Sequence, residues 1–388
     1  MDTDPQSSSS DQPSTEDPQR AQQAREYESI HNRLFLVRLL LTATLIAAYL
    51  FSGASAELAN GLANRFGDRW WWTNAVYLLV TLFAFSAVLF PLSWWSDHYL
   101  EHRYGLSRQS LNSWFADYLK GLVLELVLTV AFISVIYGLL NRFPETWWIA
   151  ATLVYVMLSV FLSALWPVFI MPLFHSFEPL EEGRLTEAVH RFAEQAGIAV
   201  LGVYRWGLEE KTETANAALT GLGKTRRIIL SDTMIDKYSE AEIIAVLAHE
   251  VGHFKHKDLW RLMTVGTLLA AAGFFAAHHV LLALVGHFGF ASIADIGAFP
   301  IFIFALVVFS VIAMPLSNTY SRRREYAADA YAVQSTGDAE ALSNALLKLA
   351  DQNLSDREPH PWIEALLHSH PSINRRVTRA RELASQAV

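Results

Sequence analysis

Long apolar blocks alternate with polar segments along this chain. Six of the blocks are long enough to cross a bilayer as helix, which takes about 20 residues. They lie near residues 34–53, 74–96, 119–141, 147–170, 260–286 and 299–317. Only the short link RFPET separates the third block from the fourth, so these two are expected to form a tight helical hairpin. The pattern predicts a multi-pass α-helical membrane protein with about six transmembrane helices.

The polar segments define the rest of the organisation. Residues 1–30 are rich in Ser, Pro and charged side chains, and such a segment cannot bury enough apolar surface to fold, so we expect a disordered tail. The two long polar segments after the fourth and sixth blocks hold most of the remaining charge and are expected to pack together as one domain. The predicted divisions are a tail at 1–30, a four-helix membrane region at 31–173, a first domain segment at 174–258, two membrane helices at 259–317 and a second domain segment at 318–388.

Composition supports the membrane class and excludes several functions. Of the 388 residues, 52% are hydrophobic and 18% are charged, whereas soluble proteins carry about 25% charged residues. The net charge is −8 and there is no basic cluster of the kind that binds nucleic acid. The chain has no cysteine, which excludes disulfides, thiolate metal ligands and cysteine nucleophiles.

The distribution of Lys and Arg predicts which side of the membrane each segment occupies, because cytosolic loops carry the excess of these residues. The tail, the loop after the second block and both polar segments contain them, whereas the loop at 287–298 has none. With six crossings, the tail, that second loop and both polar segments fall on the same side. We therefore expect the polar domain to face the cytosol.

Local patterns in the first polar segment predict a mixed α+β structure. We expect a helix over EEGRLTEAVHRFAEQAG, a strand over AVLGVYRW, and a hairpin that pairs ETANAALT with RRIILSDT across the turn GLGKT. The next helix is expected to begin at Ser239, with Glu242 completing a capping box. That helix carries the sequence IIAVLAHEVGHFKH.

The stretch HEVGH within this helix is a candidate metal site. His249 and His253 are four residues apart and therefore share a helix face, where both could bind one zinc ion. Glu250 lies beside them, placed to accept a proton from a water that zinc activates. The alternative is an amphipathic turn with two unrelated histidines. His256 lies about 10 Å further along the helix axis from His249, so one ion cannot bind both.

A third ligand is expected from SRRREYAADAYAV, where Glu325 and Asp329 share a helix face. Two carboxylates at this spacing repel unless each has a cationic partner. Zinc could pair with Glu325, and Asp329 could accept the free N–H of a ligand histidine. The alternative is ordinary salt bridging, for example between Arg322 and Glu325. Gly252 inside the metal helix suggests that another element approaches closely there.

Several segments together resemble the integral-membrane zinc metalloproteases of the type I CAAX prenyl endopeptidase family. Besides HEVGH, the similar segments are EHRYGLSRQSLNSWFADYLKG, WPVFIMPLFHSFEPLEEGRL, NAALTGLGKTRRIILSDTMI, SRRREYAADAYA and HPSINRR, in the family's order over roughly residues 90–380. The resemblance implies a zincin-like α+β peptidase domain, built from two chain segments, on membrane helices that enclose a chamber. Eukaryotic members have seven such helices, one more than the six blocks here.

The resemblance also implies a role for each matching position. His249, His253 and Glu325 would bind one zinc ion, Glu250 would be the general base, and Asp329 would orient a ligand histidine. Asn216 and Ala217 would lie on the strand along which a peptide substrate pairs. His370 and Arg375 would stabilise the oxyanion of the tetrahedral intermediate. From the residues alone, His370 is the cap before a proline-started helix.

The function expected from this sequence is a zinc-dependent membrane endopeptidase with Glu250 as its base. Its substrates would be hydrophobic, membrane-associated or prenylated (CAAX-type) peptides or proteins held at the lipid bilayer. The chain ends without a dilysine-like retention signal, which suggests a bacterial homologue in the inner membrane with a cytosolic active site, or the endoplasmic reticulum membrane if the source is eukaryotic.

Other functions remain open at the level of sequence. The chain could be a membrane quality-control protease of the heat-shock type or an inactive scaffold. It could also be a polytopic metal transporter, although a transporter would hold its ligands near the bilayer midplane. Ionisable residues at membrane depth are candidates for function by default. Here these are Glu125, His278 and His279.

Overall fold

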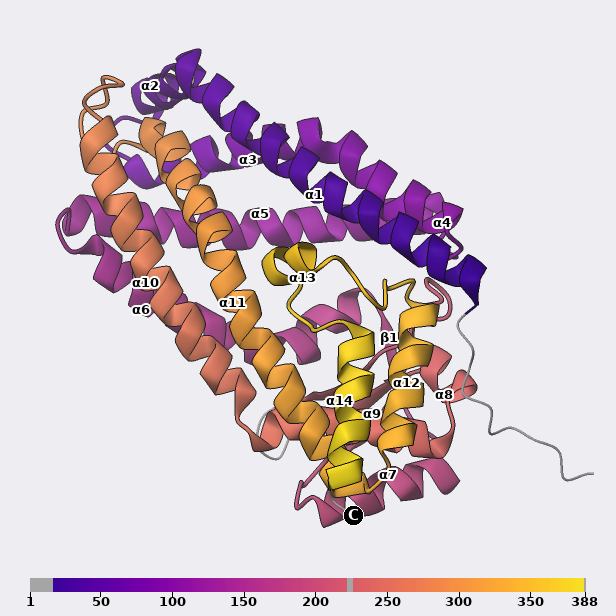
Figure 1. Ribbon diagram of the computed structural model, residues 1–388. Helices are drawn as coiled ribbons and strands as arrows, with labels where there is room; N and C mark the ends of the chain where they lie inside the picture. The colour runs from indigo at the N-terminus through magenta and orange to yellow at the C-terminus, as the bar shows by residue number, and fades with distance from the viewer. Residues whose placement is uncertain (1–16, 222–225, 387–388) are drawn as a thin grey trace, which may run out of the picture.

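The computed structural model describes residues 17–221 and 226–386 and consists of a helical membrane region joined to a mixed α/β domain (Figure 1). By length and composition, six helices of the described chain could cross a membrane, as predicted. They are built on α1 (Pro18–Phe51), α3 (Trp70–Trp94), α5 (Leu111–Arg142), α6 (Trp147–Leu165), α10 (Asp258–Leu284) and α11 (Phe299–Thr336). Short helical turns adjoin α3, α6 and α11: η1 (Trp95–Leu100), α4 (Glu101–Arg103), η2 (Trp166–Ile170), η3 (Met171–Leu173) and η5 (Ile296–Ala298).

A further helix between the first two spans, α2 (Ala54–Phe66), has 13 residues and is too short to cross a bilayer. It packs against α3 at the end of the molecule opposite the α/β domain (Figure 1).

A second feature of the membrane region is a cavity of about 690 Å³ between α1, α5, α6, α10 and α11, lined mainly by apolar side chains. This pocket is open to its surroundings, so the enclosed chamber implied by the resemblance stays a prediction.

The N-terminal tail differs from its prediction. Residues 1–16 lie outside the described residues, but residues 18–30 form the first turns of α1. Asp17 caps this helix by accepting a hydrogen bond from the Gln19 amide, and Pro18 occupies the first helical position. Ala24 is buried against Leu106 and Leu354. The burial that stabilises this segment comes from residues far away in the chain, and local composition could not reveal it.

The sheet has four strands in the order β1-β2-β4-β3: β1 (Ser176–Pro179), β2 (Gly202–Gly207), β4 (Arg227–Ser231) and β3 (Ala217–Thr220). Strands β3 and β4 are antiparallel, with Ala217 opposite Leu230, which confirms the predicted pairing. The centre of the connecting turn, residues 222–225, lies outside the described residues. Because β3 is the last strand in the order, its outer edge is free to pair with another chain.

Helices from both polar segments cover the sheet and share one hydrophobic core. The first segment contributes α7 (Arg184–Gln195), α8 (Asp232–Lys237) and α9 (Glu240–Lys255), and the second contributes α12 (Ala339–Gln352), α13 (Pro361–Leu367) and α14 (Ile373–Gln386). Leu230 and Leu247 of the first segment and Ala332 and Leu342 of the second are fully buried in this core. Helix α11 continues without a break through the predicted boundary at 317 and ends at Gly337, whose positive φ of 68° stops the helix.

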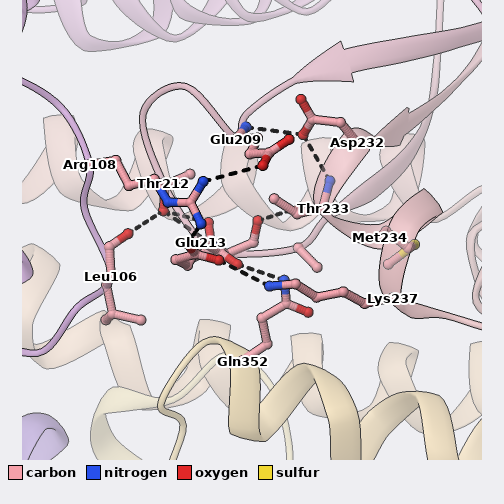
Figure 2. Close-up of polar contacts among 12 residues, drawn as sticks. Leu106, Arg108, Glu209, Thr212, Glu213, Asp232, Thr233, Met234, Lys237 and Gln352 are labelled. Atoms are coloured by element: carbon pink, nitrogen blue, oxygen red, sulfur yellow. Dashed lines mark hydrogen bonds and ion pairs between the residues drawn. The ribbon is translucent and has the colours of Figure 1, made fainter.

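A polar network joins the membrane region to the domain (Figure 2). The Arg108 guanidinium, in the loop before α5, pairs with Glu209 at 3.2 Å and also with Glu213. Lys237 of α8 pairs with the same Glu213 at 3.0 Å, and the Gln352 side chain donates to the Glu213 carbonyl oxygen. These contacts therefore hold together the loop before α5, the segment between β2 and α9, and the end of α12.

Candidate metal centre and active site

The helix that carries HEVGH is fixed at both ends. At its start, Ser239 and Glu242 form both hydrogen bonds of the predicted capping box. At its end, Lys257 adopts a left-handed conformation with φ of 56°, and α10 begins at the next residue, Asp258. The motif therefore lies at the junction between the domain and a membrane span.

Close packing of α9 against α11 brings the two halves of the site together. A Cβ atom at Gly252 would lie 2.9 Å from the Ala328 Cα and 3.0 Å from the Ala328 carbonyl oxygen. Both atoms belong to backbone and cannot move aside cheaply, so only glycine fits at this point. The predicted close approach at Gly252 is confirmed, and its partner is the helix that carries Glu325. Figure 1 shows α9 beside the lower parts of α10 and α11.

Three possible metal donors converge where these helices meet. The ligand atoms of His249, His253 and Glu325 all lie within 4.8 Å of one another. The Nε2 atoms of the two histidines are 3.2 Å apart, and the Glu325 carboxylate lies 3.5 Å from His249 and 3.4 Å from His253. Glu325 Oε2 is buried and has no hydrogen-bond donor among the described residues. Two imidazoles and one carboxylate, whose buried Oε2 lacks a hydrogen-bond partner in the described chain, fit a tetrahedral zinc site with one open position.

Each histidine is oriented by a buried carboxylate on its other side. His249 Nδ1 lies 2.9 Å from Asp329 Oδ1, as predicted from the resemblance, and His253 Nδ1 lies 3.0 Å from Asp258 Oδ2. Arg376 donates to both oxygens of Asp329, at 2.9 and 2.7 Å. Such outer partners fix the tautomer and the direction of a ligand histidine.

The partner of His253 was missed by sequence reasoning. Asp258 is only 2% exposed and also accepts a hydrogen bond from Arg324 Nε at 2.6 Å. One carboxylate therefore links His253 to Arg324, the residue that precedes Glu325. Asp258 lies five residues after His253, across the left-handed turn, and helical spacing could not place it on the histidine's face.

Replacing Asp258 with Asn should weaken metal binding by about 10- to 100-fold without unfolding the domain. The change keeps the size of the side chain but removes the charge that pairs with His253 and Arg324. Competition with a chromogenic chelator would measure zinc affinity, and a thermal melt would report the fold. Asp351→Asn is the matched control, because Asp351 also pairs with an arginine, Arg357, but lies away from the site. Unchanged zinc affinity in the Asp258 variant would show that this carboxylate does not position the ligand.

Glu250 lies beside the donors and is partly buried. Burial raises the pKa of its carboxyl, and the neighbouring histidines oppose the shift. A raised pKa suits a general base because it makes the carboxylate a better proton acceptor. Glu250 lines a cavity of about 150 Å³ that is also lined by His249, Glu325 and His370.

The two residues predicted to contact substrate line the same cavity. Asn216 and Ala217 lie at the start of the edge strand β3. The Asn216 carbonyl oxygen accepts the Ser231 amide, and its own amide donates to the Ser231 hydroxyl. These bonds fix the start of β3 against β4 and leave the outer edge of the sheet beside Glu250.

Of the two C-terminal residues predicted to contact an oxyanion, the structure brings only His370 to the site. His370 Nε2 lies 3.4 Å from Glu325 Oε1, and its side chain is 63% exposed. Arg375 points away, because its guanidinium donates to Glu364 and its side chain is 55% exposed. The neighbouring Arg376 lines the cavity instead and is 6% exposed. Successive residues of a helix point about 100° apart, so only one of the two arginines of HPSINRR could face inward.

The polar residues at membrane depth have other surroundings. His278 Nδ1 accepts a hydrogen bond from Trp147 Nε1 at 3.1 Å, which satisfies that nitrogen within the helical core. Glu125 is exposed on α5. Within residues 17–221 and 226–386, one group of three His or acidic side chains lies close enough together to hold a metal ion. It consists of His249, His253 and Glu325.

Six membrane-spanning helices, a His, His and Glu donor set and a glutamate beside it are together the features of a membrane metallopeptidase. Comparison with known proteins gives the family. The profile of peptidase family M48 matches residues 179–384, and that of the CAAX prenyl protease N-terminal region, five membrane helices, matches residues 11–176. The chain belongs to peptidase family M48 and is a metalloendopeptidase of the CAAX prenyl protease 1 type. Within residues 17–176 the structure has four helices of spanning length and the short α2.

Individual relatives cover most of the chain. YhfN of Bacillus subtilis, an uncharacterized metalloprotease, is 29% identical over 363 residues, which are 92% of this chain and 85% of the relative. CAAX prenyl protease 1 of Saccharomyces cerevisiae is 30% identical over 309 residues, 74% of this chain and 67% of the relative. The crystal structure of S. mikatae Ste24p superposes with a TM-score of 0.81 at 24% identity, over 94% of this chain and 89% of that one. That last likeness shows the shared fold.

Proposed function

We propose that this protein is a zinc-dependent endopeptidase that cleaves hydrophobic or membrane-tethered peptides at the cytosolic surface of the membrane. The observation that carries the proposal is the convergence of His249, His253 and Glu325 beside Glu250. The junctions of the domain with α10 and α11 lie close to these residues, so the site is near the ends of two membrane spans. A substrate held in the bilayer could reach it without leaving the membrane.

The ligand set supports zinc as the metal. Two neutral imidazoles and one carboxylate with an open fourth position are the donors that catalytic zinc uses in proteases. When bound, zinc would polarise the scissile carbonyl group and acidify the attacking water. His249, His253 and Glu325 would hold it, while Asp329 and Asp258 would keep the two imidazoles in the binding tautomer.

The remaining residues would carry out the proton transfer and stabilise charge. Glu250 would accept the proton of the attacking water and pass it to the leaving amine. His370 and Arg376 line the same cavity and offer positive or N–H groups to the developing oxyanion. A peptide added to the free edge of β3, at Asn216 and Ala217, would present its backbone to these groups.

Location and substrate class follow from the charge distribution and from the relatives. The excess of Lys and Arg in the polar segments supports a cytosolic domain, and the similarity to a Bacillus protein supports a bacterial source, in which the helices would lie in the inner (cytoplasmic) membrane. Several relatives are named CAAX prenyl proteases, so a prenylated peptide is one substrate to test. A hydrophobic peptide without a prenyl group is the other.

The proposal is tested with wild-type protein reconstituted in vesicles and a fluorogenic peptide tethered by a lipid chain. Removal of metal by a chelator should reduce cleavage to background, and one equivalent of zinc per chain should restore it. A metal transporter would bind zinc but leave the peptide intact. Cleavage that persists after complete metal removal would contradict the proposal.

A further inference from the structure

Two cavities meet at Glu250, one towards each end of the edge strand β3. The 150 Å³ cavity contains Asn216 and Ala217 at the start of the strand. A second cavity, of about 940 Å³, contains Leu219 and Gly221 at the other end of the strand. Glu250 lines both. A peptide paired with β3 would therefore place the residues on one side of the cleaved bond in the small cavity and those on the other side in the large one.

The small cavity has an apolar wall. Besides the residues of the metal site, it is lined by Met234, Val246, Leu342, Leu346 and Leu349. Among the described residues that line it, the one Lys or Arg side chain is that of Arg376, and its charge is already paired with Asp329.

The large cavity differs in charge. Arg226, Lys255 and Lys257 line it, and none of the three forms an ion pair with a carboxylate in the described part of the chain. Two carboxylates line the same cavity: Asp258 is already paired with Arg324 and His253, and Glu250 lies where this cavity meets the small one. On a protein with a net charge of −8, this is a local excess of positive charge beside the catalytic residues.

The same cavity also has an apolar component. Phe254, Leu259 and Trp260 line it and are 38%, 45% and 52% exposed, at the end of α9 and the first turn of α10. The Arg226 guanidinium stacks over the Phe254 ring at 4.3 Å from its centroid. Such a stacked arginine keeps its N–H groups available to a planar anion, such as a carboxylate.

We infer that the large cavity is a specificity subsite that binds a substrate carboxylate within a few residues of the cleaved bond, on one side of that bond only. This inference rests on the proposed peptidase function and adds a charge preference to it. The carboxylate has two possible sources, an acidic side chain or the C-terminus of the peptide. Anionic phospholipid is a less favoured occupant, because the cavity is continuous with the edge strand and with Glu250.

The test compares kcat/KM for peptides that differ only in charge, with wild-type protein in neutral detergent at low salt. One series carries two Asp or two Asn residues before the cleaved bond, and a second series carries them after it. A third pair has a free or an amidated C-terminus. We expect about a tenfold preference for the anionic peptide in the series that reaches the large cavity, and a loss of this preference in high salt.

The variant that isolates the subsite is Arg226→Gln/Lys255→Gln, two residues of the cavity wall that take no part in the turn before Asp258. It should lose the preference for acidic peptides while cleaving neutral peptides at the wild-type rate. The matched control is Arg191→Gln/Arg205→Gln, which removes the same charge from exposed positions outside the cavity and should keep the preference.

The outcomes separate this inference from the proposed function. If neutral peptides are cleaved but acidic and neutral peptides have equal kcat/KM, the subsite is refuted and the peptidase stands. If no peptide is cleaved, the proposed function fails and the inference fails with it. If the double variant is impaired equally on all peptides and only in vesicles of anionic lipid, the cations dock on the membrane and the subsite is refuted.

Discussion

Glu250→Gln should reduce peptide cleavage to background while the protein keeps its full complement of zinc. The substitution preserves the size of the side chain and its hydrogen bonding, but it removes the carboxylate that accepts a proton. A general base contributes about 10²–10⁴ in rate, and a base that also holds the attacking water should lie at the upper end of that range. The histidines are untouched, so the metal and the fold should survive. Turnover, zinc content and a thermal melt are measured on the same preparation.

The control for this variant is Glu242→Gln, on the same helix. Glu242 caps α9 and pairs with Lys348, so its loss should affect stability more than turnover. If zinc-loaded Glu250→Gln kept more than a tenth of wild-type turnover, Glu250 would not be the base.

Glu325→Ala is expected to release the metal and with it all activity. His249 and His253 alone leave two protein ligands, whereas catalytic zinc sites in proteases use three. Glu325 also lies 3.6 Å from the Arg376 guanidinium, so its removal leaves a buried positive charge less compensated and should lower the melting temperature. Elemental analysis should find close to zero zinc per chain, against one in wild type.

A matched change outside the site is Glu340→Ala, since Glu340 pairs with Arg381 on the exposed surface of α12 and α14. It should retain wild-type zinc and activity. Full zinc occupancy in folded Glu325→Ala would remove Glu325 from the ligand set.

The membrane helices and the hairpin were predictable because their signals are local. A 20-residue apolar block needs no distant partner to be recognised, and the pairing of β3 with β4 follows from two adjacent strands and a glycine-bearing turn. The helical start of α1 was not predictable, because Ala24 is buried by Leu106 and Leu354, which are remote in sequence. Helix α11 crosses a predicted boundary because hydrophobicity changes at 317 while the helix itself continues.

The residues of the candidate metal site divide in the same way into those with local signals and those without. His249, Glu250 and His253 were found from helical spacing, and Glu325 from a second pair of residues four apart. Asp258 was missed because it reaches His253 across a left-handed turn. The sequence pointed to Arg375, whereas the structure turns Arg376 towards the cavity, because a motif does not show which face of α14 packs on the domain. Only the contact of Arg376 with Asp329 reveals that face.

The measurement that tests the central claim most directly is the position of bound zinc in crystals of the purified protein. An anomalous difference map collected at the zinc absorption edge should contain one peak per chain, between Nε2 of His249, Nε2 of His253 and the Glu325 carboxylate. A peak at His278 and His279 within the membrane region, or zinc-replete protein with no peak at the three predicted ligands, would contradict the metallopeptidase site described here.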